Sequence, residues 1–147
     1  MTTDTLKRTP VTKETEMRDS VQDKSIVVIT ADHRADALTT WEKEKPERYR
    51  DTGISEDAAV QVAGGMAHAG KAPFIYAISP FLINRIAEHH KLQAGVMNLP
   101  YHTVAVGAGF SYNDSGPTHY SLDDLAIMRA IPNMVILSPS DAQMAAE

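Results

Sequence analysis

A carboxylate at the start of a small-residue helix is the feature of this sequence that most suggests chemistry. In "ERYRDTGISEDAAVQVAGGMA", residues 47–67, Glu56 follows a glycine-containing turn and opens a stretch rich in alanine and glycine. Ser55 can cap the helix, and negative charge in a first turn gains about 0.3–1 kcal/mol from the helix dipole, so a purely structural role is possible. Gly64 and Gly65, however, each cost about 1 kcal/mol relative to alanine inside a helix. That cost indicates that another backbone or a flat ligand approaches this helix closely.

The elements that must position Glu56 alternate between strands and helices. Short apolar segments predict strands at 25–31, 73–79, 101–107 and 133–139, and the stretches 55–69, 81–94 and 119–130 predict helices, with a last helix from Ser140. Such alternation predicts an α/β fold: a mostly parallel sheet with helices on both faces. Proteins of this class bind ligands at the carboxyl ends of the strands, and Glu56 is expected near that rim. The last helix shows no C-terminal signal, so we expect a truncated or unusually short domain.

Bulk composition excludes several functional classes. The chain has 147 residues, enough for one domain, and its net charge of -5 argues against a nucleic-acid partner, which needs a basic face. No apolar run approaches the roughly 18 residues of a membrane span, and the N-terminus lacks a signal-peptide core, which predicts a cytoplasmic protein. Cysteine is absent. We expect a polar N-terminal arm over residues 1–23, with a short helix from about Thr12 to Gln22, and one domain over 24–147.

Two glycine-rich segments imitate nucleotide-binding loops. "GMAHAGK", residues 65–71, has phosphate-loop spacing, but Ala72 stands where a magnesium-binding Ser or Thr is needed, and the segment closes a helix with Gly70 as its C-cap. "GAGFSY", residues 107–112, has a tyrosine in place of the third fingerprint glycine and predicts a strand-end turn.

The histidines do not predict a metal site. The chain has six of them, and His89 and His90 are adjacent, so their side chains point to different sides of a helix. We interpret this pair as a surface feature and predict no metal on this chain.

Two long segments resemble the pyrimidine-binding domain of the transketolase family. They are "PERYRDTGISEDAAVQVAGGMAHAGKAPFIYAISPFL" and "NLPYHTVAVGAGFSYNDSGPTHYSLDDLAIMRAIPNMVILSPSD". The resemblance covers roughly residues 25–147, and "GPTH" and "RAIPNMVILSPSD" look most like transketolases or deoxyxylulose-phosphate synthases. Several separated motifs occur in the same order and at the same spacing, which makes the resemblance specific.

The resemblance implies roles for particular residues around thiamine diphosphate. Glu56 of "GISE" would bind the aminopyrimidine ring and promote the imino tautomer that activates the thiazolium carbon, with Ile54 of the same motif beside the cofactor. Phe81 would stack on the pyrimidine. Three further residues would face the substrate: His119 of "GPTH", Arg85 and Asp32. Each of these residues also has a purely structural interpretation, such as a core phenylalanine for Phe81 and a surface or capping histidine for His119.

Several positions depart from the pattern of sugar transketolases. Asp36 and Ala37 stand where a phosphate-binding serine is usual, Ser138 stands in the segment of an arginine, and Ser115 replaces an acidic residue before "GPTH". These departures argue against a phosphorylated sugar as substrate.

The resemblance also implies that the chain supplies half of an active site. It lacks the Gly-Asp-Gly…Asn segment with which the family's other domain holds Mg²⁺ and the diphosphate. We therefore expect a partner chain that carries that domain and the Mg²⁺, assembly as a homodimer or heterotetramer, and transfer of a ketol or acyl carbanion unit between small carbonyl or sugar compounds. The alternative hypothesis is a non-catalytic interaction or regulatory module that keeps the fold and its dimer surface.

Overall fold

A single parallel sheet organises the protein, whose computed structural model describes residues 25–146. The sheet has four strands in the order β2-β1-β3-β4, with every neighbouring pair parallel. Their bounds are β1 Ile26–Thr30, β2 Tyr49–Asp51, β3 Ala72–Ile78 and β4 His102–Val106. The register aligns Val28 of β1 with Phe74 of β3, and Phe74 with His102 of β4. The predicted α/β class and parallel sheet are confirmed.

Helical segments connect the strands and follow the last one. The α-helices are α2 Asp36–Glu44, α3 Glu56–His68, α4 Ser79–Leu82, α5 Ala87–His90, α6 Asp124–Arg129 and α7 Ala142–Ala146. A π-helix, η2, spans Lys91–Val96, and short 3₁₀ turns occur at η1 Pro46–Arg48, η3 Asn113–Ser115 and η4 Pro117–His119. The predicted N-terminal arm and its helix lie outside the described residues.

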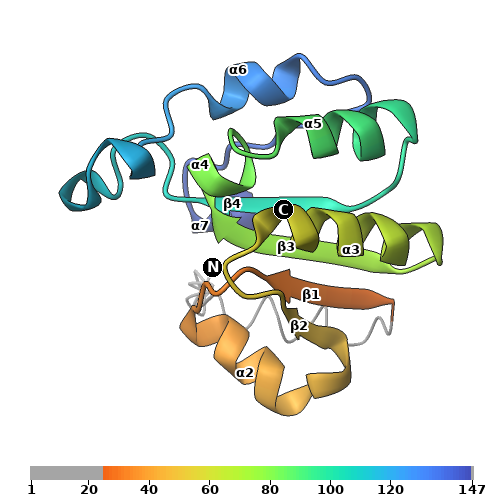
Figure 1. Ribbon diagram of the computed structural model, residues 1–147. Helices are drawn as coiled ribbons and strands as arrows, with labels where there is room; N and C mark the ends of the chain where they lie inside the picture. Colours follow the sequence, from red (N-terminus) through yellow and green to blue (C-terminus); the bar gives the residue numbers. More distant parts are fainter. Residues whose placement is uncertain (1–24, 147) are drawn as a thin grey trace, which may run out of the picture.

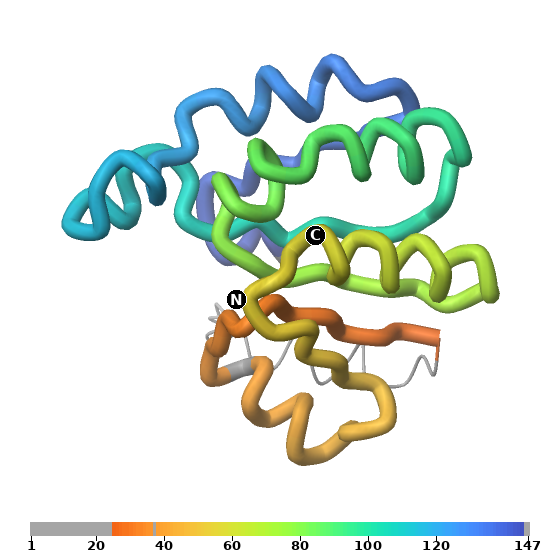
Figure 2. Tube along the Cα trace, in the orientation of Figure 1, coloured from red at the N-terminus to blue at the C-terminus, as the bar shows by residue number. Residues whose placement is uncertain are grey.

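Helices cover both faces of the sheet, as predicted. The odd-numbered residues Val27 and Ile29 of β1 join Ile75 of β3 in a cluster with α3 and the α4–α5 region. Val28, on the opposite face of β1, packs with Trp41 of α2 and with β2. Figure 2 shows this separation, with α3 and the α4–α5 segment on one side of the strands and α2 on the other. The alternation of side chains along buried parallel strands therefore supplies two cores.

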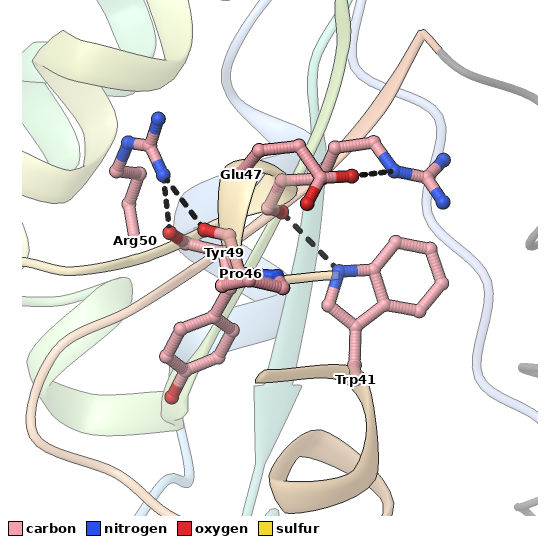
Figure 3. Close-up of polar contacts among 6 residues, drawn as sticks. Trp41, Pro46, Glu47, Tyr49 and Arg50 are labelled. Carbon is pink, nitrogen blue, oxygen red and sulfur yellow. Dashed lines mark hydrogen bonds and ion pairs between the residues drawn. The ribbon is translucent and has the colours of Figure 1, made fainter. Parts of the chain in front are cut away.

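Strand β2 is absent from the sequence-based prediction because its three residues have no apolar pattern. It is placed by tertiary contacts: Trp41 of α2 donates its indole N–H to the Arg48 carbonyl at 3.2 Å, while Arg50 donates to the carbonyls of Pro46 and Tyr49 at 3.2 and 2.6 Å. Figure 3 shows how these bonds fix the corner between α2 and β2. The corner fixes β2, which leads into the turn before Glu56.

The predicted strand at 133–139 is wrong. None of its residues pairs with a described strand; Met134 and Ile136 pack on a small cluster around Met128, while Val135 and Leu137 are 81% and 83% exposed. Buried and exposed residues alternate along this segment as they do in a strand, but the segment forms no backbone ladder with a described strand. A hydrophobic pattern alone does not provide the strand edge with which the segment would pair.

The predicted helix at 81–94 is interrupted, and the helix at 119–130 is shorter than expected. Turns at residues 83–86 separate α4 from α5, which lets Ile83 join the Met128 cluster while Ile86 joins the main core. A continuous helix would not present these two side chains to different clusters in this way. Only Asp124–Arg129 of the second segment is α-helical.

Neither glycine-rich segment forms a nucleotide-binding loop: residues 65–71 end α3 in a turn, and residues 107–112 form a turn after β4, as the sequence indicated. Gly70 has φ +80° just beyond the end of α3, and the Lys71 amide donates to the Met66 carbonyl at 2.9 Å, closing the helix. Gly107 and Gly109 also have positive φ, at +80° and +64°, directly after β4.

Within residues 25–146, every helix is too short or too polar to cross a bilayer.

Candidate functional site

Glu56 is the first residue of α3, at the rim formed by the carboxyl ends of the strands. The turn before it is fixed to β1: the Thr52 amide and hydroxyl both donate to the Thr30 carbonyl, at 2.9 and 3.0 Å. Gly53, with φ +69°, provides the left-handed turn that only glycine adopts at low cost. The Glu56 side chain is only 5% exposed. The sequence thus places a buried carboxylate at a helix N-terminus.

Ser55 does not cap α3 through its side chain, which corrects the sequence-based prediction. It occupies the N-cap position, yet its hydroxyl donates to the Asp57 carboxylate at 2.7 Å instead of accepting from a backbone amide. This hydrogen bond, followed by one from the Ala58 backbone, lowers the pKa of Asp57. Asp57 is exposed, whereas Glu56 is buried, so the two neighbouring carboxylates lie in different environments.

Arg85 connects Glu56 to Phe81. Its Nη1 lies 3.1 Å from Oε2 of Glu56, and its guanidinium carbon lies 4.4 Å from the centre of the Phe81 ring. The Arg85 side chain is 53% exposed, so it covers the buried carboxylate from the solvent side. The contact joins α3 to the segment that follows β3.

His119 packs against Phe81 of this group. Its ring meets Phe81 edge-on, with 5.0 Å between ring centroids, and Tyr112 lies 6.3 Å away in a similar arrangement. The hydroxyl of Thr118 is 3.0 Å from Nδ1 of His119. Residues 107–122, which contain "GPTH", extend from the same edge of the sheet at which α3 and α4 begin (Figure 1).

An open pocket of about 430 Å³ lies between α4 and the "GPTH" loop. It is lined by Pro80, Phe81, Asn84, Arg85, Pro117, Thr118 and Tyr120. Its walls combine two aromatic rings, a cation and polar groups, and the side-chain oxygen of Asn84 is buried without a hydrogen-bond partner among the described residues. A flat, polar ligand fits this mixture of groups.

A polar network that the sequence analysis missed holds α4 against the loop. The Ser79 hydroxyl, fully buried at the end of β3, lies 2.6 Å from the Ser121 hydroxyl and donates to Asp124 of α6 at 2.9 Å. Asn84 donates to Asp123 at 2.6 Å. A serine directly after an apolar strand, followed by a proline that starts a helix, was the available signal for this network.

Ile54 and Asp32 are not brought into the group. Ile54 is 80% exposed, and it does not line the pocket. Asp32 follows β1 with φ +51°, its amide donates to Asp51 at 2.9 Å, and no described contact joins it to Glu56, Phe81 or His119. Their cofactor and substrate roles stay predictions.

The interpretation of His89 and His90 as a surface pair is wrong for His90. Its ring is fully buried, with Nε2 2.9 Å from the Leu82 carbonyl and Nδ1 2.9 Å from the Tyr101 hydroxyl. A carbonyl only accepts, so Nε2 carries the proton and Nδ1 accepts from Tyr101. Burial lowers the pKa of His90, despite its bond to Leu82, and raises that of Tyr101. Because Leu82 follows Phe81 in α4, His90 anchors the element that presents Phe81.

We expect this histidine to make the fold sensitive to acid. Its folded pKa lies below the unfolded value of about 6.5, so the unfolded chain binds the extra proton and stability falls as pH drops below that value. The loss is at most about 1.4 kcal/mol for each pH unit per proton. Urea unfolding at pH 7.5 and 5.5 should show a larger decrease for the wild-type chain than for His90→Gln. His68→Gln, at an exposed site, should behave as wild type; an equal pH dependence in His90→Gln would contradict this role.

The structure accounts for a small residue in α3 at one position, Gly64. A Cβ atom at Gly64 would collide with the side chain of Gln93 in η2, so glycine permits close packing there. At Gly65 nothing lies within 4 Å, and that side of the helix, including Val62, is exposed.

Within residues 25–146, no group of three or more His, Asp or Glu side chains is placed to hold a metal ion.

Comparison with known proteins identifies the family. Residues 16–147 match the model of the transketolase pyrimidine-binding domain. The chain belongs to this family. It is 36% identical over 123 residues to one subunit of the apulose-4-phosphate transketolase of Phocaeicola vulgatus, 40% over 121 residues to 1-deoxy-D-xylulose-5-phosphate synthase of Halothermothrix orenii, and 35% over 119 residues to a putative transketolase C-terminal section of Methanocaldococcus jannaschii. The family resemblance predicted from the sequence is confirmed.

The fold also matches a solved transketolase structure. A split-gene transketolase, described as an inactive β4 tetramer, superposes with a TM-score of 0.75 at 30% identity, covering 89% of this chain and 42% of that one. The matches to the three relatives cover 83%, 82% and 80% of this chain but only 39%, 19% and 38% of theirs. The chain therefore corresponds to a minor part of each of these proteins.

Proposed function

We propose that this chain supplies the aminopyrimidine-binding half of the thiamine diphosphate site in a transketolase-like transferase. The observation that supports this most strongly is the buried Glu56 carboxylate at the start of α3, linked through Arg85 to the ring of Phe81. A carboxylate and a flat aromatic surface are the two groups that an aminopyrimidine needs, one for its ring nitrogen and one for its π face.

The residues present fit the pyrimidine end of the cofactor. Phe81 and Arg85 line the 430 Å³ pocket, and Arg85 also pairs with Glu56. When bound, thiamine diphosphate supplies the nucleophilic carbon with which such enzymes break and form bonds beside a carbonyl group. Glu56 would hold a proton at the ring nitrogen and exchange it during turnover, in a position from which water is largely excluded. His119, edge-on to Phe81, would orient the substrate.

The diphosphate end requires groups that these residues do not offer. Mg²⁺ needs about six oxygen ligands in octahedral geometry, and we assign that ion and the diphosphate to a partner chain. One relative named as a single subunit of its enzyme, and another named as a C-terminal section, support an enzyme divided between chains. The exposed side of α3 around Val62 and Gly65 is suited to close contact with a second chain, in a homodimer or heterotetramer. Small carbonyl or sugar compounds are the proposed substrates, and the cytoplasm the proposed location.

Reconstitution tests the proposal. The chain is co-purified with a diphosphate-binding subunit of a split transketolase, and ketol transfer between a panel of ketoses and aldehydes is measured with thiamine diphosphate and Mg²⁺. Activity should require both chains and the cofactor. A stable complex that neither binds the cofactor nor transfers a ketol unit would favour the non-catalytic module instead.

A further inference from the structure

We propose that Arg85 occupies the aminopyrimidine site of the free chain and that the cofactor must displace it. This inference rests on the proposed function and adds a device that regulates access to the same site. Arg85 contacts both groups that would hold the ring: its Nη1 lies 3.1 Å from Glu56, and its guanidinium carbon lies 4.4 Å from the Phe81 ring centre.

The guanidinium resembles the ligand in the features that these two groups recognise. It is planar and delocalised, it donates N–H groups in its plane to a carboxylate, and it stacks on an aromatic face. An aminopyrimidine offers the same combination of a flat face and in-plane nitrogen groups. Two planar groups cannot lie on one face of Phe81 and hydrogen-bond the same carboxylate oxygen together. The two ligands are therefore alternatives.

The exposed fractions of Glu56 and Arg85 indicate that Arg85 blocks access to Glu56 from solvent. Glu56 has 5% of its side chain exposed, whereas Arg85 has 53% exposed. Arg85 also lines the open pocket, and Glu56 does not. A ligand that enters the pocket beside Phe81 consequently meets Arg85 before it can reach Glu56.

The contacts of Arg85 are weak enough to be exchanged. Among residues 25–146, its guanidinium makes a single hydrogen bond, to Glu56, in addition to the stack on Phe81. The residue lies in the turn between α4 and α5, and its long side chain can rotate toward solvent without movement of the backbone. After rotation, the guanidinium would remain at the pocket rim, where the sequence analysis expected an arginine that faces the substrate.

Competition of this kind lowers the affinity of the free chain for pyrimidines. A ligand must replace the ion pair and the cation–π contact before it gains its own contacts. We expect the free chain to bind thiamine, which lacks the diphosphate, about tenfold more weakly than a chain without the guanidinium. The site would thus bind the cofactor mainly when a partner chain binds the diphosphate and so supplies additional binding energy.

The test uses the free chain with two probes, thiamine and 4-amino-5-hydroxymethyl-2-methylpyrimidine, titrated by NMR to millimolar concentrations. Arg85→Ala should bind both probes about tenfold more tightly than the wild type. Arg129→Ala, which removes an exposed arginine of α6, is the matched control and should bind as the wild type does. The double variant Glu56→Gln with Arg85→Ala should lose the gain.

The outcomes separate this inference from the proposed function. If Arg85→Ala binds no more tightly than wild type while Glu56→Gln weakens wild-type binding, Arg85 is not a competitor and the inference is overturned, although the pyrimidine site stands. If neither Glu56→Gln nor Arg85→Ala changes binding, the site itself is misplaced and both proposals fail.

A measurement on the wild-type chain covers the case in which Arg85→Ala does not fold. The Nε–H signal of Arg85 should move toward that of a solvent-exposed arginine as thiamine is added, while the Arg129 signal stays in place. An Arg85 signal that stays in place while added thiamine shifts the ring signals of Phe81 would overturn the inference.

Discussion

Substitution of Glu56 by glutamine is expected to lower the turnover number of the assembled enzyme by about 10²–10⁴-fold, the range typical for loss of a general acid–base group. Glutamine preserves the size and shape of the side chain but cannot exchange a proton with a ring nitrogen. The position is buried at the start of α3, so water cannot easily replace the missing group. Steady-state kinetics of the variant with its partner chain measure the effect.

Asp57→Asn is the matched control for this experiment. It removes the neighbouring carboxylate in the same turn, but Asp57 is exposed and bonds to Ser55, outside the pocket. Its turnover should stay close to wild type. The melting temperature of Glu56→Gln should change little, because glutamine keeps the shape of the buried side chain and the half-exposed Arg85 guanidinium left without its partner is solvated. Near-normal activity in Glu56→Gln would reduce Glu56 to a charge that stabilises the helix.

The isolated chain is expected to show no turnover and to bind thiamine diphosphate no more tightly than about millimolar. One hydrogen bond from Glu56 and stacking on Phe81 provide about 1–3 kcal/mol at an open surface, and a millimolar dissociation constant already requires about 4 kcal/mol. The ligand must also displace Arg85. Calorimetric titration with thiamine diphosphate and Mg²⁺ measures the affinity.

Addition of the partner chain should bring the affinity into the micromolar range, about a thousandfold tighter. Magnesium and the diphosphate then gain the oxygen ligands and amide donors that this half does not offer. Micromolar binding by the isolated chain would show that a complete site is present within it, which contradicts the half-site interpretation.

Local sequence signals were sufficient for the element that bears Glu56. The turn at Gly53, the acidic first turn and the small-residue run place the start of α3 at Glu56, and the stop at Gly70 follows from the same logic. Strands β1 and β3 were predictable because buried parallel strands are continuous apolar runs, and the edge strand β4, although partly exposed, keeps the valines and alanine of such a run. These features depend on residues that are close in sequence.

Long-range pairing explains what the sequence could not predict. Strand β2 depends on its pairing with β1 and on the hydrogen bond from Trp41 of α2 to the Arg48 carbonyl. Residues 133–139 have the hydrophobic pattern of a strand but no described strand with which they pair. His90 is buried because Tyr101 and the Leu82 carbonyl satisfy both of its nitrogens, and neither partner is visible in the local pattern of adjacent histidines. The contact between Arg85 and Glu56 spans 29 residues and depends on the break between α4 and α5.

The central claim is that Glu56 and Phe81 hold the aminopyrimidine ring. A crystal structure of the reconstituted assembly with thiamine diphosphate and Mg²⁺ tests it most directly. We predict that a ring nitrogen lies within hydrogen-bond distance of the Glu56 carboxylate, with the ring against Phe81 and the Arg85 guanidinium displaced from both. A pyrimidine ring bound without contact to Glu56, on another face of this domain or wholly within the partner chain, would contradict the account.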